Sequence, residues 1–257
     1  MFEHLAAPTT SSAYLDNAIA IHRATIDAMR PDAGERATPQ RSLIGKAMLR
    51  CNDLYLDMKA AIDGNARPWT IAAAARAPLE LATRILAAQR GIDGWDRLIG
   101  YWSGQFDTQM RLAGMHIPAL AGEYAQLQAA AAQLPPLQGV PLQSLELAVQ
   151  EIVRWDEAHP GGVFAGDLLR GFYDTDIRAL HACAHVNMIW VDNLPGEAAE
   201  AIWRNAVNWS VLFMLRAAGD VCGRGDAWAT EVLTRQLLTT AAQRQALAAE
   251  LRGQADR

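Results

Sequence analysis

The segment TPQRSLIGKAMLRCNDLYLDMKAAIDG, residues 38–64, shows most clearly how this chain folds. Its apolar side chains recur every three or four positions, which places them on one face of an α-helix. That face carries Ile44, Met48, Cys51, Tyr55, Met58 and Ile62. Thr38 is a suitable N-cap, Pro39 fits the first turn, and Gly64 can end the helix. We therefore predict an amphipathic helix that begins at Pro39 and ends at Gly64.

Helical spacing extends over almost the whole chain, and no run of residues has the alternation typical of a β-strand. Further helices are predicted at 13–30, 70–90, 93–114, 142–158, 174–192, 197–221 and 226–251, with another after Pro118. The first of these helices is expected to be capped by Ser11 or Ser12. The sequence thus predicts an all-α fold, a single helical bundle of about nine or ten helices. Residues 1–12 are expected to form a flexible N-terminal tail. Residues 13–252 are expected to form one all-helical domain, with an internal linker at 134–144, where Pro and Gly interrupt helical structure.

Composition restricts the function classes. The chain has 257 residues, 51% of them hydrophobic, and a formal net charge of -5. This charge gives no reason to expect broad nonspecific binding to nucleic acid, although a local cationic pocket is compatible with it. Three widely spaced cysteines are typical of reduced thiols, and we find neither a secretion signal nor a membrane-spanning stretch. We expect a cytoplasmic protein with no membrane partner.

The segment 70–90 is almost wholly apolar, which is typical of a central helix. Arg76, Glu80 and Arg84 follow one another at four-residue spacing and share one face. Pro78 lies among them and predicts a kink. We interpret Arg76 and Glu80 as ligand-binding residues, with Glu80 holding Arg76 in place for an anionic ligand such as RNA or a small molecule. A simple ladder of ion pairs is the alternative.

The segment 174–192 carries a second ionisable face, formed by Asp174, Arg178, His181, His185 and Asp192 beside an apolar stripe. Ionisable residues next to a core-facing stripe belong at an interface, a cleft or a polar layer of the core. We therefore expect this face to lie within reach of the Arg76 face and to form a common pocket with it.

The spacing of the two histidines is compatible with a metal site. His181 and His185 lie one helical turn apart, which suits coordination of one metal ion, with Glu80 or the pair Asp53 and Asp57 as the source of a third ligand. This reading predicts a metal- or haem-dependent enzyme that acts on a small molecule. The alternative is that the histidines simply hydrogen-bond within a structural polar layer. A noncatalytic interaction or sensor module is a further reading of the whole chain.

Arg178 and His185, with six residues between them, resemble the R-x(4-6)-H signature of HEPN-type helical bundles, many of which are ribonucleases or components of toxin and phage-defence systems. The stretches FYDTDIRALHACAH, residues 172–185, and ARAPLE, residues 75–80, are also similar to an uncharacterised bacterial helical family. The resemblance is limited to these two segments. It departs from the HEPN pattern at Ala179, where a polar residue is usual.

The HEPN resemblance implies RNA cleavage without a metal or any other cofactor. His185 or His181 would move protons to and from the ribose and the leaving oxygen, and Arg178 would offset charge on the phosphate. Asp174 would contribute to ligand binding, or would simply pair with Arg178 along the helix. Since such sites commonly form across two subunits, the resemblance also implies a homodimer.

Overall fold

The computed structural model describes residues 1–31, 37–92, 94–99, 144–159, 176–185, 193 and 195–239. Its helices include α1 (Ser11–Ala28), α2 (Pro39–Asp63), α3 (Pro68–Gln89), α6 (Leu145–Ala158), α8 (Arg178–Ala184), α10 (Gly196–Val221) and α11 (Ala227–Thr234). The described residues contain no strand. The predicted all-α fold is therefore confirmed. The predicted total of nine or ten helices stays a prediction, because residues 100–143 and several shorter segments lie outside the described part.

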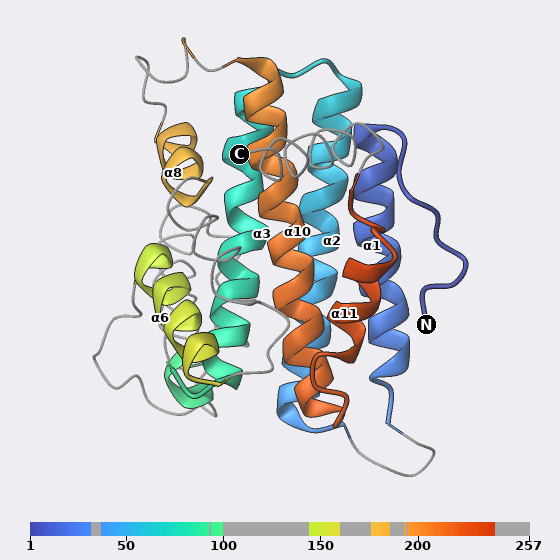
Figure 1. Ribbon diagram of the computed structural model, residues 1–257, viewed down its shortest axis with the longest axis vertical. Coiled ribbons are helices and arrows are strands. Elements are labelled where there is room, and N and C mark those ends of the chain that lie inside the picture. Colours follow the sequence, from blue (N-terminus) through green and yellow to red (C-terminus); the bar gives the residue numbers. More distant parts are fainter. Residues whose placement is uncertain are drawn as a thin grey trace, which may run out of the picture.

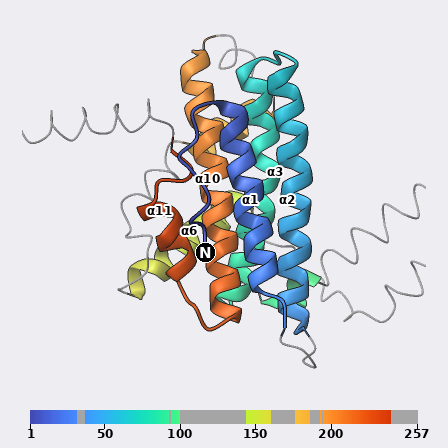
Figure 2. The same ribbon diagram turned by 90° about the vertical axis from the view of Figure 1, so that its right-hand side faces the viewer.

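The long helices α1, α2, α3 and α10 run side by side as a bundle (Figure 1). The most extensive contact between two helices is that of α3 with α10, and α2 packs against both α1 and α3. The shorter helices α6 and α8 pack on α3, whereas α11 packs on α10 (Figures 1 and 2). Hence α6 and α8 lie on one side of the bundle and α11 lies on another.

The core is densest along α3 and α10, because their sequences are apolar on nearly every side. All residues of 82–88 in α3 and of 210–219 in α10 are buried. The prediction that the segment 70–90 forms a central helix is thus confirmed. None of the helices in the described part combines the length and the apolar character needed to cross a bilayer.

Local sequence signals account for the beginnings of several helices. The Thr38 hydroxyl accepts a hydrogen bond from the Arg41 N–H at 3.2 Å, and Pro39 occupies the first turn of α2, as predicted. The predicted caps of α1 are wrong, because Thr10 rather than Ser11 or Ser12 accepts the Ala13 N–H, at 3.1 Å. The helix consequently begins at Ser11.

The C-terminal part of the described chain differs from the predicted pattern. The last helix, expected to continue to residue 251, ends at Thr234, and Gln236 has a φ of +52°, a left-handed conformation that interrupts a helix. Within residues 1–12, which are predicted to form a tail, one aromatic side chain belongs to the core. Phe2 is fully buried, and its N–H donates to Glu231 of α11 at 2.9 Å.

Candidate functional site

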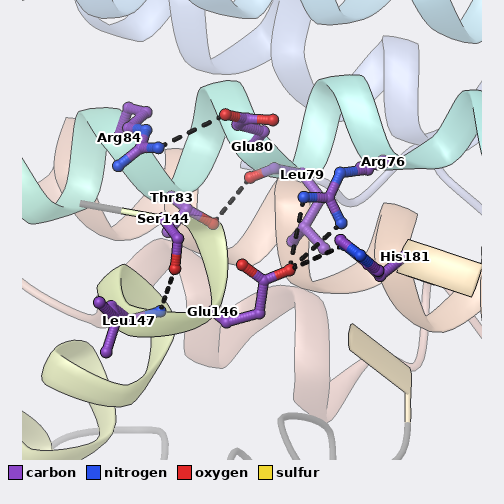
Figure 3. Close-up of polar contacts among 9 residues, drawn as sticks. All are labelled: Arg76, Leu79, Glu80, Thr83, Arg84, Ser144, Glu146, Leu147 and His181. Carbon is purple, nitrogen blue, oxygen red and sulfur yellow. Dashed lines mark hydrogen bonds and ion pairs between the residues drawn. The ribbon is translucent and has the colours of Figure 1, made fainter. Parts of the chain in front are cut away.

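Arg76, Glu146 and His181 meet where α3, α6 and α8 adjoin (Figure 3). Both terminal nitrogens of Arg76 donate to Oε1 of Glu146 at 3.4 Å. Nδ1 of His181 lies 3.4 Å from the same oxygen. One carboxylate therefore links the two ionisable faces that the sequence placed on separate helices.

The first turn of α6 positions Glu146. The Ser144 hydroxyl caps this helix by accepting the Leu147 N–H at 3.2 Å, and a carboxylate one residue into a helix is stabilised by the helix dipole. Partial burial raises the pKa of Glu146, but its own backbone N–H, the Arg76 guanidinium, the Ser144 hydroxyl and His181 together hold this pKa below its usual value. Glu146 is therefore an anion at neutral pH.

The short helix α8 presents its ionisable residues to solvent. Leu180 and Cys183 are buried and anchor the helix, whereas Arg178, His181 and His185 are exposed. The two imidazole rings lie with their centroids 4.3 Å apart and their planes inclined by 50°. His185 is the C-cap of α8, and its backbone N–H donates to the His181 carbonyl at 3.0 Å. Two adjacent imidazoles are thus accessible to a ligand from outside.

The structure brings together only part of the predicted pocket. Arg76 and His181 adjoin through Glu146, so the two predicted faces lie within reach of each other. Glu80 does not hold Arg76, because it pairs with Arg84 one turn along α3, at 3.4 Å (Figure 3). This pair fits a simple ion pair along the helix better than it fits a ligand-binding role for Glu80. Asp174 and Asp192 lie outside the described residues.

Glu146 is not among the residues predicted from the sequence. An acidic residue directly after a Ser N-cap is a common helix-starting pattern, so its local context gives it only a capping role. Its second role depends on side chains from α3 and α8, and this tertiary contact has no local signal in the sequence.

Metal binding gains no support from the arrangement of side chains. Across the part of the chain that the structure describes, no group of three or more His, Cys, Asp or Glu residues is arranged to hold a metal ion. The ligand set suggested above, with His181, His185 and Glu80, is not assembled because Glu80 faces Arg84.

Comparison of this chain with protein-family models, with curated proteins and with solved structures finds no match. The indication of function is therefore the cluster formed by Arg76, Glu146, His181 and His185.

Proposed function

We propose that this protein is a cytoplasmic ribonuclease that binds single-stranded RNA at the exposed face of α8 and cleaves it without a metal ion. The observation that carries the proposal is the exposed pair His181 and His185, with ring centroids 4.3 Å apart. Cleavage through the ribose 2′-hydroxyl needs one group to remove a proton and another to protonate the leaving oxygen. Histidine can do either near neutral pH.

Glu146 has a positioning role in this proposal. Its carboxylate lies 3.4 Å from Nδ1 of His181 and favours the tautomer that carries a proton on that nitrogen. Nε2 of His181 is then the atom that exchanges a proton with the RNA. Arg76 holds the same carboxylate from the other side, so that Glu146 keeps a fixed position between α3 and α8.

Arg178 supplies the positive charge. It is exposed and lies one turn before His181, on the face that also carries His185. A guanidinium there offsets the negative charge that builds up on the phosphate during cleavage. As part of the same proposal, and as the HEPN resemblance implies, two copies of the chain associate so that their α8 faces adjoin.

The test is cleavage of a fluorescently labelled single-stranded RNA in the presence of EDTA. We expect His181→Ala and His185→Ala each to lower the cleavage rate about a hundredfold or more, since each removes a proton-transfer group. Arg178→Ala should also lower the rate. His4→Ala is the matched control, because His4 is exposed and lies outside the cluster. Circular dichroism establishes that each variant is folded.

Glu146→Gln tests the positioning role separately. This variant should shift the pH dependence of the cleavage rate, and Glu146→Asp should restore part of the wild-type profile. Full activity in both histidine variants would refute the catalytic assignment. Binding of the RNA without cleavage, measured by fluorescence anisotropy, would refute the nuclease and leave an RNA-binding protein. Sedimentation of the wild-type chain as a monomer would refute the dimer.

A further inference from the structure

A cavity of about 550 Å³ opens between the end of α1, the start of α2 and the α10–α11 turn. The described residues that line it come from none of α3, α6 and α8, the helices that carry the cluster around Glu146. The cavity is therefore distinct from the cluster around Glu146. Its lining includes Arg30, Arg41, Arg224 and Glu231, with Ala227 and Trp228 as apolar wall.

The carboxylate in this lining is already neutralised. Glu231 accepts from the Met1 ammonium and from the Phe2 N–H, both at 2.9 Å, and lies 3.4 Å from Arg235. Slight burial raises the pKa of Glu231, but these bonds together lower it. Glu231 thus stays ionised and engaged with cations of its own, and does not balance the charge of the cavity arginines.

Arg41 and Arg224 bring positive charge to the cavity, and neither forms an ion pair with a carboxylate of the described residues. Nε and Nη2 of Arg41 donate to the Val221 carbonyl at 3.4 Å, which holds the guanidinium in place through an uncharged partner. The backbone N–H of Arg224 donates to the Gly219 carbonyl at 2.7 Å, which fixes the turn that carries this side chain. Arg30 differs from both, because it pairs with Asp27 at 2.9 Å.

Cys222, which also lines the cavity, indicates separately that the guanidinium groups of Arg41 and Arg224 lie near the same part of its wall. Burial raises the pKa of this thiol, and the positive charges of Arg41 and Arg224 act against that increase. Both guanidinium groups are therefore close enough to one lining residue to affect its ionisation. Like charges that face one cavity repel each other, and a bound anion relieves this repulsion.

We propose that this cavity binds a small organic anion. The carboxylate or phosphate group of this ligand lies between Arg41 and Arg224, where the guanidinium groups can donate paired hydrogen bonds. The apolar part of the ligand packs against Trp228 and Ala227. The volume is in the range of small-molecule binding sites. This proposal is independent of RNA cleavage at α8.

Isothermal titration calorimetry at fixed ionic strength tests the proposal with benzoate, phenyl phosphate, inorganic phosphate and benzyl alcohol as probes. We expect an organic anion to bind more tightly than inorganic phosphate, and the neutral alcohol not to bind. The comparison of benzoate with phenyl phosphate identifies the preferred acidic group. Arg41→Ala and Arg224→Ala should each weaken binding about tenfold or more. Arg154→Ala, on the exposed face of α6, should leave it unchanged.

Arg41 contributes a bond to the end of α10, so its removal could impair folding. Arg224→Ala removes an exposed side chain instead and tests the same cavity in a folded protein. Equal binding of the anions by wild type and by Arg224→Ala would overturn the proposal. It would also be overturned if benzyl alcohol bound as tightly as benzoate, or if no anion bound with a Kd below about 10 mM.

Discussion

Arg216 of α10 and Asp156 of α6 form an ion pair inside the protein: Nη1 lies 2.7 Å from Oδ2, and each side chain is only 2% exposed. Nε of Arg216 also lies 2.7 Å from Asp226, which precedes α11. Arg90, directly after α3, lies 3.4 Å from Asp220 of α10. Because these residues come from four different helical regions, this buried charged cluster connects α3, α6, α10 and α11 at one end of the bundle.

Removing the central cation of this cluster should destabilise the protein strongly. Arg216→Met leaves the carboxylate of Asp156 buried beside other acidic groups, and we expect the free energy of unfolding to fall by about 3–5 kcal/mol. Urea denaturation measures this change. The matched control is Arg154→Met, which breaks a surface ion pair with Glu151 and should cost no more than about 1 kcal/mol. Similar losses in the two variants would show that the cluster does not stabilise the fold.

The buried imidazole of His22 in α1 should make stability depend on pH. Its Nδ1 lies 3.0 Å from Oδ1 of Asn52. Burial lowers the pKa of His22 to about 4, although the bonds to Asn52 and to the Met48 backbone act in the opposite direction. An unfolded chain takes up this proton below about pH 6.5, whereas the folded protein does so only near pH 4. The unfolded state thus binds more protons in this interval, and stability should decrease as the pH is lowered through it.

His22→Asn should make the free energy of unfolding less dependent on pH between about 6.5 and 4, because the group that titrates differently in the two states is gone. Urea denaturation at several pH values gives this slope for the wild type and the variant. His4→Asn is the control, since His4 is exposed and its loss should leave the slope unchanged. If His22→Asn keeps the wild-type slope, His22 does not titrate abnormally in the folded protein.

The sequence was informative where structure depends on neighbouring residues. The all-α class follows from periodicity, and the limits of α2 follow from Thr38, Pro39 and Gly64, which act on their own helix. The end of α11 could not be predicted in this way. Helical spacing continues beyond Thr234, and the turn at Gln236 accompanies the burial of Leu237 against the core. Tertiary packing therefore overrides local periodicity there.

The candidate site was predictable only in part, because it too depends on tertiary contacts between helices. The positions of Arg76 and His181 on their helices identified two charged faces, and these faces do adjoin. Their connection, however, is made by Glu146, which is 70 positions from Arg76 in the sequence. Periodicity assigns a residue to a face of its own helix, but it does not identify the residues on other helices that this face meets.

Arg76→Gln should raise the pKa of Glu146, because the guanidinium is one of the groups that keep this carboxylate ionised. The titration of the side-chain carboxyl carbon, followed by ¹³C NMR, measures this pKa directly. Arg50→Gln is a suitable control, since Arg50 pairs with the exposed Asp53 elsewhere on the surface. An unchanged pKa in Arg76→Gln would mean that Arg76 does not contact Glu146 in solution.

The α10–α11 turn approaches α10 closely at Gly219. A Cβ atom added at Gly219 would lie 2.0 Å from the Gly225 carbonyl oxygen, a distance that no packing tolerates. The turn cannot easily move away, because the N–H groups of Arg224 and Gly225 both donate to the Gly219 carbonyl, at 2.7 and 3.1 Å. We expect Gly219→Ala to lower the free energy of unfolding by about 1–3 kcal/mol. It should also weaken anion binding in the neighbouring cavity, because this turn carries Arg224.

Gly45→Ala in α2 is the matched control for this substitution. The nearest atom to the added Cβ there is Cε of Met29, at an ordinary contact distance of 3.9 Å. Because alanine favours a helix more than glycine does, Gly45→Ala should be neutral or up to about 1 kcal/mol more stable than the wild type. Urea denaturation of both variants separates the two cases, which differ only in what surrounds the added methyl group. Equal stability of Gly219→Ala and Gly45→Ala would show that the turn is not held against α10 as closely as its hydrogen bonds indicate.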